Sequence, residues 1–166
     1  EWAVENGITN GKANGLFGSN DPCTRGQIVT FLWRAAGSPA PKGTVTVPTD
    51  VLPGSYCYNA VAWAIENGIT NGLADGSFGA GGACTRAQCV ALLFRSAMAN
   101  GLEAVTLQDL ISGFGDAAEL PAYAVPAMNW ALSTRIVQGN GRLLLSNTSC
   151  TRAQIVTFLY RAYQGK

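Results

Sequence analysis

The sequence contains no histidine and carries few charges. Its 166 residues include 11 Lys and Arg and 10 Asp and Glu, so charged residues make up 13% of the chain and the formal net charge is +1. Without histidine, Ser-His-Asp and Cys-His catalysis and any His-ligated metal site are excluded. The small net charge argues against nonspecific nucleic-acid binding, which needs a large basic excess. No apolar run reaches the roughly 18 residues that a membrane-spanning helix requires, so we expect no membrane insertion.

The composition is that of a folded chain. Apolar residues make up 48% of the sequence, which argues against disorder, and the length fits one domain or a few small units sharing a core. The sequence opens on Glu1-Trp2 and shows no signal peptide, so we interpret it as a trimmed fragment.

Internal repetition is the strongest signal. The pentapeptide Cys-Thr-Arg-Gly/Ala-Gln occurs at 23–27, 84–88 and 150–154. A second pattern, Trp-Ala-Val/Ile-Glu-Asn-Gly-Ile-Thr-Asn-Gly, occurs at 2–11 and 63–72, and Trp130-Ala-Leu is a diverged third copy. Two landmarks recurring together indicate three tandem copies of one unit.

Each repeat is predicted to contain two helices joined by a Gly-rich loop. The first helix is expected over about 56–67 and 124–134, and the second over about 24–36, 85–98 and 151–163. We divide the chain into repeat one (1–37), a linker (38–46), repeat two (47–99), a linker or short helix (100–112) and repeat three (113–166). A single unit of this size buries little surface, so we expect a mainly α fold in which three repeats pack as one compact, pseudo-threefold helical spindle.

The Thr and Gln of each pentapeptide form the pattern of a capping box. The Thr hydroxyl accepts from the backbone N–H three residues on, and the Gln side chain bonds back to the Thr N–H. We therefore predict structural caps at Thr24, Thr85 and Thr151, with Gln27, Gln88 and Gln154.

The Arg of each pentapeptide is harder to explain structurally. A cation in the first turn of a helix is disfavoured by about 0.3–1 kcal/mol, yet Arg25, Arg86 and Arg152 all occupy that position. Either each Arg forms an anion-binding site with the helix-start N–H groups, or it pairs with an acid of the neighbouring repeat, such as Asp50 or Asp116.

The tryptophans and cysteines also leave alternatives open. Trp2, Trp63 and Trp130 suit either a buried core or a flat surface for sugar rings. Cys23, Cys84 and Cys150 share one repeat position, which favours small apolar packing. Cys57 and Cys89 occur only in repeat two, one on each helix, and we predict that they form a disulfide. Without a CxxC pair or histidine we expect no metal and no cofactor.

A lead-in Asp followed by Trp-Ala-Ile, Gly-Ile-Thr-Asn-Gly, Gly-x-Phe and Thr-Arg-x-Gln resembles the S-layer homology (SLH) domain family. The resemblance implies a pseudo-trimeric helical fold that anchors proteins to the bacterial envelope. It also implies grooves between repeats that bind an anionic secondary cell-wall polysaccharide, commonly carrying pyruvate ketals. By motif position the ligand-binding residues would be Arg25, Arg86, Arg152, Trp2, Trp63, Trp130, Asp50 and Asp116.

The leading functional hypothesis is therefore a noncatalytic carbohydrate-binding anchor, extracellular on the bacterial cell wall or cell surface. The alternative is a protein–protein interaction module of the same fold, with a surface-layer subunit or a host factor as partner. The acidic residues form no repeated pair of the kind that a glycosidase requires, so we expect no enzymatic activity.

Overall fold

The computed structural model describes residues 1–102 and 108–164, and these residues are mainly helical. The first helices of the three repeats are α1 (Trp2–Glu5), α3 (Tyr58–Glu66) and α5 (Val125–Ser133). The second helices are α2 (Arg25–Ala35), α4 (Arg86–Ala99) and α6 (Arg152–Gln164). Short 3₁₀ helices η1 (Ile111–Gly113), η2 (Ala117–Glu119) and η3 (Ala122–Ala124) precede α5. The predicted mainly α fold is confirmed.

The predicted short helix or linker over 100–112 is described only in part. Residues 103–107 lie outside the described residues, residues 108–110 are not helical, and η1 begins at Ile111. The five longer helices begin and end within two residues of the predicted limits. Within the described residues, none of the helices combines the length and apolar character needed to cross a membrane.

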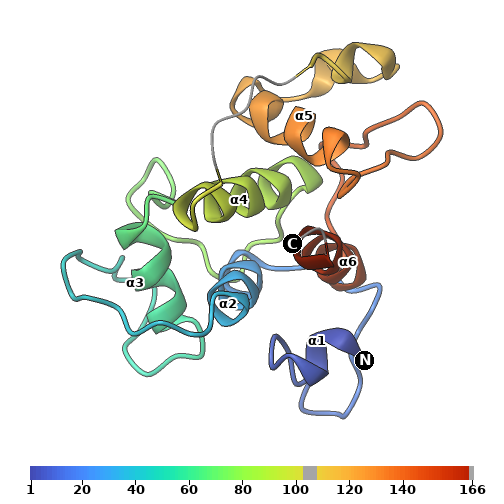
Figure 1. Ribbon diagram of the computed structural model, residues 1–166. Helices are drawn as coiled ribbons and strands as arrows, with labels where there is room; N and C mark the ends of the chain where they lie inside the picture. The colour runs from blue at the N-terminus through green and yellow to red at the C-terminus, as the bar shows by residue number, and fades with distance from the viewer. Residues whose placement is uncertain (103–107, 165–166) are drawn as a thin grey trace.

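The repeats are interleaved rather than separate. Figure 1 shows α2, α4 and α6 in the middle of the molecule, with α3, α5 and α1 outside them. Each first helix contacts a second helix of another repeat, because α3 packs on α2, α5 on α4, and α1 on α6. The last of these contacts joins the beginning of the chain to its end, so the core belongs to the three repeats together.

A closed ring of backbone hydrogen bonds joins the three repeats where their second helices start. The Cys23 N–H donates to the Cys150 carbonyl (2.7 Å), the Cys150 N–H donates to Cys84 (2.9 Å), and the Cys84 N–H donates to Cys23 (2.9 Å). All three cysteines are fully buried. The repeated Cys therefore marks the point where one repeat meets the other two, while pseudo-threefold symmetry of the whole molecule stays a prediction.

The capping boxes are present at all three second helices. In each, the Thr hydroxyl accepts from the Gln backbone N–H and the Gln side chain accepts from the Thr backbone N–H. These bonds satisfy two N–H groups that would otherwise lack partners at the helix start. Each repeat arginine directly follows its capping Thr, so the capping box also fixes the backbone from which the arginine side chain extends.

The predicted Cys57–Cys89 disulfide is wrong for this structure, in which all five cysteines are free and buried. Cys89 lies in the first turns of α4, and its thiol interacts with those of Cys84 and Cys150 at the ring. Cys57 lies at the start of α3, where its sulfur is 4.0 Å from the Ser55 hydroxyl. The helix position of Cys89 turns its side chain toward the ring, where repeats one and three have Ile28 and Ile155.

Candidate functional site

Two of the three repeat arginines reach across to the loop of another repeat. The Arg25 Nε donates to the Phe78 carbonyl (2.8 Å), and its guanidinium lies 5.0 Å from the centre of the Phe78 ring. The Arg152 Nε donates to the Phe17 carbonyl (2.9 Å), and its guanidinium lies 5.0 Å from the Phe17 ring and 5.4 Å from the Phe31 ring. A carbonyl and an aromatic face thus offset the cost of placing a cation at a helix start.

Arg86 lacks the first of these contacts. Its Nε is buried and has no hydrogen-bond partner in the described part of the chain, although its guanidinium lies 4.9 Å from the Phe158 ring. Repeat three has Leu144 where the other loops have Phe17 and Phe78. Burial accordingly lowers the pKa of Arg86. The three arginines are therefore not equivalent.

The lead-in aspartates hold loops instead of pairing with arginines. Asp50 accepts from the N–H groups of Phe78 (2.9 Å) and Gly79 (2.8 Å). Asp116 accepts from those of Leu144 (2.8 Å) and Leu145 (2.7 Å). Across the described residues, the ion pair that is present joins Lys12 to Asp21, so the alternative of Arg–Asp salt bridges is not the one that the structure forms.

The same hydrogen bonds set the pKa values of both aspartates. The N–H of Phe78, followed by that of Gly79, holds the pKa of Asp50 below its usual value. At Asp116 desolvation acts against the shift, yet the bonds from Leu144 and Leu145 keep the pKa below its usual value. Both carboxylates are charged at neutral pH and are already engaged with backbone donors.

The three repeat tryptophans were expected either in the core or as flat surfaces for sugar rings, and they differ in burial. Trp63 and Trp130 are only 6% and 5% exposed and belong to the core. Trp2 is half-buried, with its ring 5.3 Å from that of Tyr160 and 6.3 Å from that of Tyr163. The faces of Trp63 and Trp130 are therefore not open to a sugar ring.

A groove of about 280 Å³ receives residues from all three repeats. Arg25 comes from repeat one, Arg95 and the loop 70–73 come from repeat two, and Tyr123 comes from repeat three. Its remaining lining residues are Gln88, Ala91 and Leu92. No Asp or Glu is among these lining residues. The volume is at the small end of ligand pockets, and the two guanidinium groups favour an anion.

Tyr123 was not singled out from the sequence. Its hydroxyl lies close to the capping residue Thr85, and Arg95 and Arg25 lie nearby. Burial raises the pKa of Tyr123, so the phenol stays protonated at neutral pH. A signal was present in the sequence, because Tyr56 precedes Trp63 by the same interval as Tyr123 precedes Trp130. In the structure Tyr56 lies close to the capping residue Thr24 in the same way.

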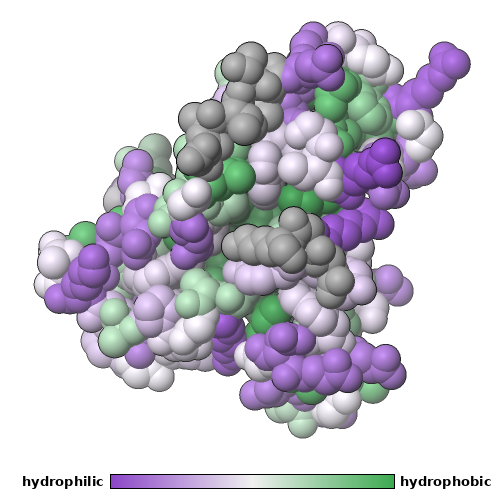
Figure 2. Space-filling model, viewed as in Figure 1, coloured by the Kyte–Doolittle hydropathy of each residue, from purple (hydrophilic) through white to green (hydrophobic). Residues whose placement is uncertain are grey.

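Two larger hollows differ from this groove in character. One, of about 560 Å³, lies between the ends of α4, α5 and α6, and the other, of about 590 Å³, lies between α1 and α6. Most of their lining residues are apolar, and Figure 2 shows apolar surface between the α1 region and the rest of the molecule. Arg161, in the first hollow, donates to the Ile136 carbonyl (2.9 Å). Among the described residues, no three His, Cys, Asp or Glu side chains are placed to hold a metal ion.

Comparison with known sequences agrees with this arrangement. The family profile described as "S-layer homology domain" matches residues 1–29 and 49–88. Over these two segments the chain is similar to S-layer homology domains. Both matched segments contain the Trp, loop and Arg positions of their repeat, and the second also contains the lead-in Asp, so they include Arg25, Asp50 and Arg86.

The chain is also similar to the "Surface-layer 125 kDa protein" of Lysinibacillus sphaericus. The two are 26% identical over 166 residues, which is 98% of this chain and 13% of that protein. This chain therefore spans about an eighth of the length of the curated relative that it matches. The similarity extends through repeat three, where the SLH profile does not match but where Asp116 and the third capping box repeat the contacts of repeat two.

Proposed function

We propose that this chain is a noncatalytic module that anchors a protein to the bacterial cell surface by binding an anionic secondary cell-wall polysaccharide. The observation that carries the proposal is the groove at Arg25, which has two arginines and no carboxylate in its lining. The SLH match and the surface-layer relative support a location on the outside of the cell. A pyruvate ketal on the polysaccharide is what the family resemblance implies, and its carboxylate has the charge that the groove accepts.

Arg25 is held ready to bind an anion. Its Nε is occupied by the Phe78 carbonyl and its plane is supported by the Phe78 ring. Arg25 forms no ion pair with a described carboxylate, so its two terminal nitrogens are the donors left for a ligand. A guanidinium fixed in this way binds a carboxylate through two parallel hydrogen bonds with little loss of side-chain freedom.

The arrangement offers little for catalysis. Asp50 and Asp116 accept hydrogen bonds from the backbone and have lowered pKa values, so neither is suited to donate a proton near neutral pH. The groove at Arg25 contains no carboxylate that could act as a general acid or base. Binding alone is the chemistry that these residues support.

A sedimentation assay on purified cell-wall sacculi tests the proposal. The chain is incubated with sacculi that retain the secondary polymer and with sacculi from which it has been extracted. We expect co-sedimentation only with the first, and loss of it in Arg25→Ala. Equal binding to both preparations would contradict the proposal, and binding to a surface-layer protein without polymer would favour the protein-interaction alternative.

A further inference from the structure

Two places in the structure bring a repeat arginine near a lead-in tyrosine, and the first of them is the 280 Å³ groove. In one, Arg25 lies with Tyr123, and in the other Arg152 lies near Tyr56. Each tyrosine lies close to the capping Thr of the preceding repeat, and each is well exposed, at 49% for Tyr123 and 60% for Tyr56. The two positions are thus matched in sequence and in local contacts, yet the arginines beside them differ.

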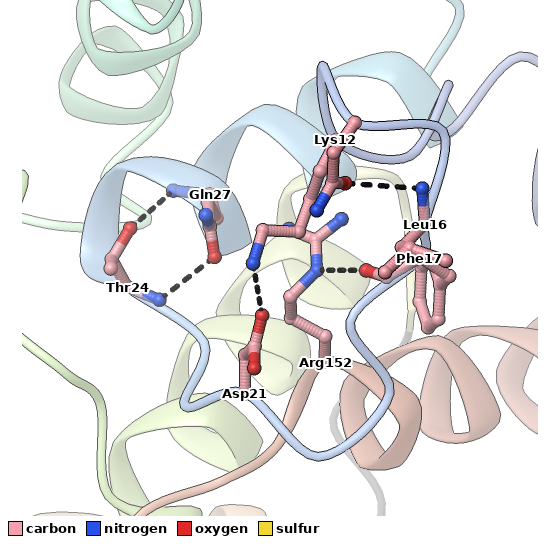
Figure 3. A network of polar contacts seen from close by, with 8 residues as sticks. Lys12, Leu16, Phe17, Asp21, Thr24, Gln27 and Arg152 are labelled. Carbon is pink, nitrogen blue, oxygen red and sulfur yellow. Dashed lines mark hydrogen bonds and ion pairs between the residues drawn. The ribbon is translucent and has the colours of Figure 1, made fainter.

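The arginine beside Tyr56 is closed off. Arg152 is only 4% exposed, and the rings of Phe17 and Phe31 both lie against its guanidinium. Figure 3 shows its side chain extending to the Phe17 carbonyl, next to the ion pair of Lys12 and Asp21. A ligand could reach this guanidinium only after the loop that carries Phe17 had moved.

The arginine beside Tyr123 is open. Arg25 is half-buried, one aromatic ring lies against its guanidinium, and it lines the 280 Å³ groove together with Arg95. The only aromatic residue in the lining of that groove is Tyr123. The repeat tryptophans Trp63 and Trp130 are enclosed in the core and so leave no face for a ligand.

We infer that Tyr123 is a ligand-contacting residue, and that its ring provides the flat apolar face on which a sugar of the anionic polysaccharide stacks while Arg25 binds the acidic group. This inference rests on the function proposed above and adds that, of these two arginines, Arg25 binds the ligand and Arg152 does not. An exposed aromatic ring with an anchored hydroxyl gives contact area at small entropic cost.

The contribution of repeat three makes this site a product of the whole fold. Tyr123 follows η2 and lies within η3, which packs on α4. The groove therefore needs repeat one for Arg25, repeat two for Arg95 and repeat three for Tyr123. Sugar binding through this groove requires the three repeats to be assembled.

Isothermal titration with purified pyruvylated wall polysaccharide tests the inference, and Tyr56 provides the matched control. We expect Tyr123→Ala to weaken binding about tenfold and Tyr123→Phe, which keeps the ring, to bind within about twofold of wild type. Tyr56→Ala should also bind within about twofold of wild type. Thermal unfolding confirms that each variant folds.

Two results would overturn the inference while leaving the proposed function standing. In the first, Tyr123→Ala binds the polysaccharide as tightly as wild type does. In the second, Tyr56→Ala weakens binding as much as Tyr123→Ala does. Failure of the wild-type chain to bind the polysaccharide would overturn both. In wild type, an NMR titration is an independent measure: the ring signals of Tyr123 should shift with added polysaccharide, and those of Tyr56 should not.

Discussion

Arg25 and Asp50 hold opposite sides of the same residue. The Asp50 carboxylate accepts from the Phe78 N–H, and the Arg25 Nε donates to the Phe78 carbonyl, at 2.9 and 2.8 Å. The two side chains belong to different repeats and have opposite charges, yet they act through a backbone unit and not on each other. The loop is thereby fixed between repeats one and two, and Arg25 is oriented in its groove.

Weakening the hydrogen bonds from the Phe78 loop to Asp50 should loosen the position of Arg25. In Asp50→Asn one carboxylate oxygen is replaced by an NH₂ group, which cannot accept a hydrogen bond, so the side chain no longer has one acceptor oxygen for each of the Phe78 and Gly79 N–H groups. We expect a lower melting temperature and weaker polysaccharide binding, because the support under Arg25 loosens. Asp75→Asn is the control, because Asp75 bonds to Ser77 within the tip of the same loop. Equal effects of the two variants would show that Asp50 has no special role.

The same aspartates predict how stability depends on pH. Asp50 and Asp116 have pKa values in the folded state that lie below the ordinary carboxyl value of 3.8. Their stabilising contribution is therefore complete above pH 3.8 and is lost as the pH falls through the lower folded pKa values. Urea unfolding at pH 6 and at pH 3 should show a lower midpoint in acid, and Asp50→Asn should reduce that difference. A midpoint independent of pH in this range would contradict the assignment.

Arg152 should behave as a structural residue. It is buried, its Nε is bonded to the Phe17 carbonyl, and two phenylalanine rings lie against it. We expect Arg152→Ala to lower the free energy of unfolding by about 1–3 kcal/mol. Arg25→Ala, at a half-buried position with one ring contact, should cost less stability but more binding. Chemical denaturation measures the loss of stability in both variants, and titration with polysaccharide measures the loss of binding. A larger loss of stability in Arg25→Ala, or a larger loss of binding in Arg152→Ala, would contradict the difference between the two arginines.

The caps give a prediction that does not involve a ligand. Thr85→Ala removes the acceptor for the Gln88 N–H at the start of α4 and should cost about 1 kcal/mol. Gln88→Glu should keep most of the stability, because a carboxylate can accept from the Thr85 N–H in place of the amide oxygen. Guanidinium unfolding of both variants measures the difference. A Glu variant as unstable as the Ala variant would show that a carboxylate does not replace the Gln88 amide in the capping box.

What the sequence predicted well was local, and what it missed was long-range. The helix limits and capping boxes follow from residues within four positions of one another. The acceptor of Arg25 lies 53 residues away and that of Arg152 lies 135 residues away, and both are backbone carbonyls, which no residue pattern identifies. For this reason the sequence left open the alternative of salt bridges to Asp50 and Asp116, where the structure has hydrogen bonds from loops.

The error over the disulfide has a similar origin. Cys57 and Cys89 are unshared by the other repeats, which made them a plausible pair in sequence, but Cys89 is turned toward Cys84 and Cys150 by its position in α4. Tyr123 was missed because a single exposed tyrosine is common on protein surfaces. Its position beside Arg25 becomes visible only when repeat three is packed against repeats one and two.

The buried thiols lead to the last prediction, which concerns their chemistry. Burial, with the neighbouring Cys84 and Cys150, raises the pKa of Cys23 to about 12, and all five thiols are buried. The native protein should react very slowly with Ellman's reagent, because burial keeps the reagent from all five thiols. In denaturant all five thiols should react at once, which also provides the control for complete reduction. Fewer than five thiols in denaturant, with a non-reduced peptide joining Cys57 to Cys89, would restore the pairing expected from the sequence and contradict the arrangement in which Cys89 lies with Cys84 and Cys150.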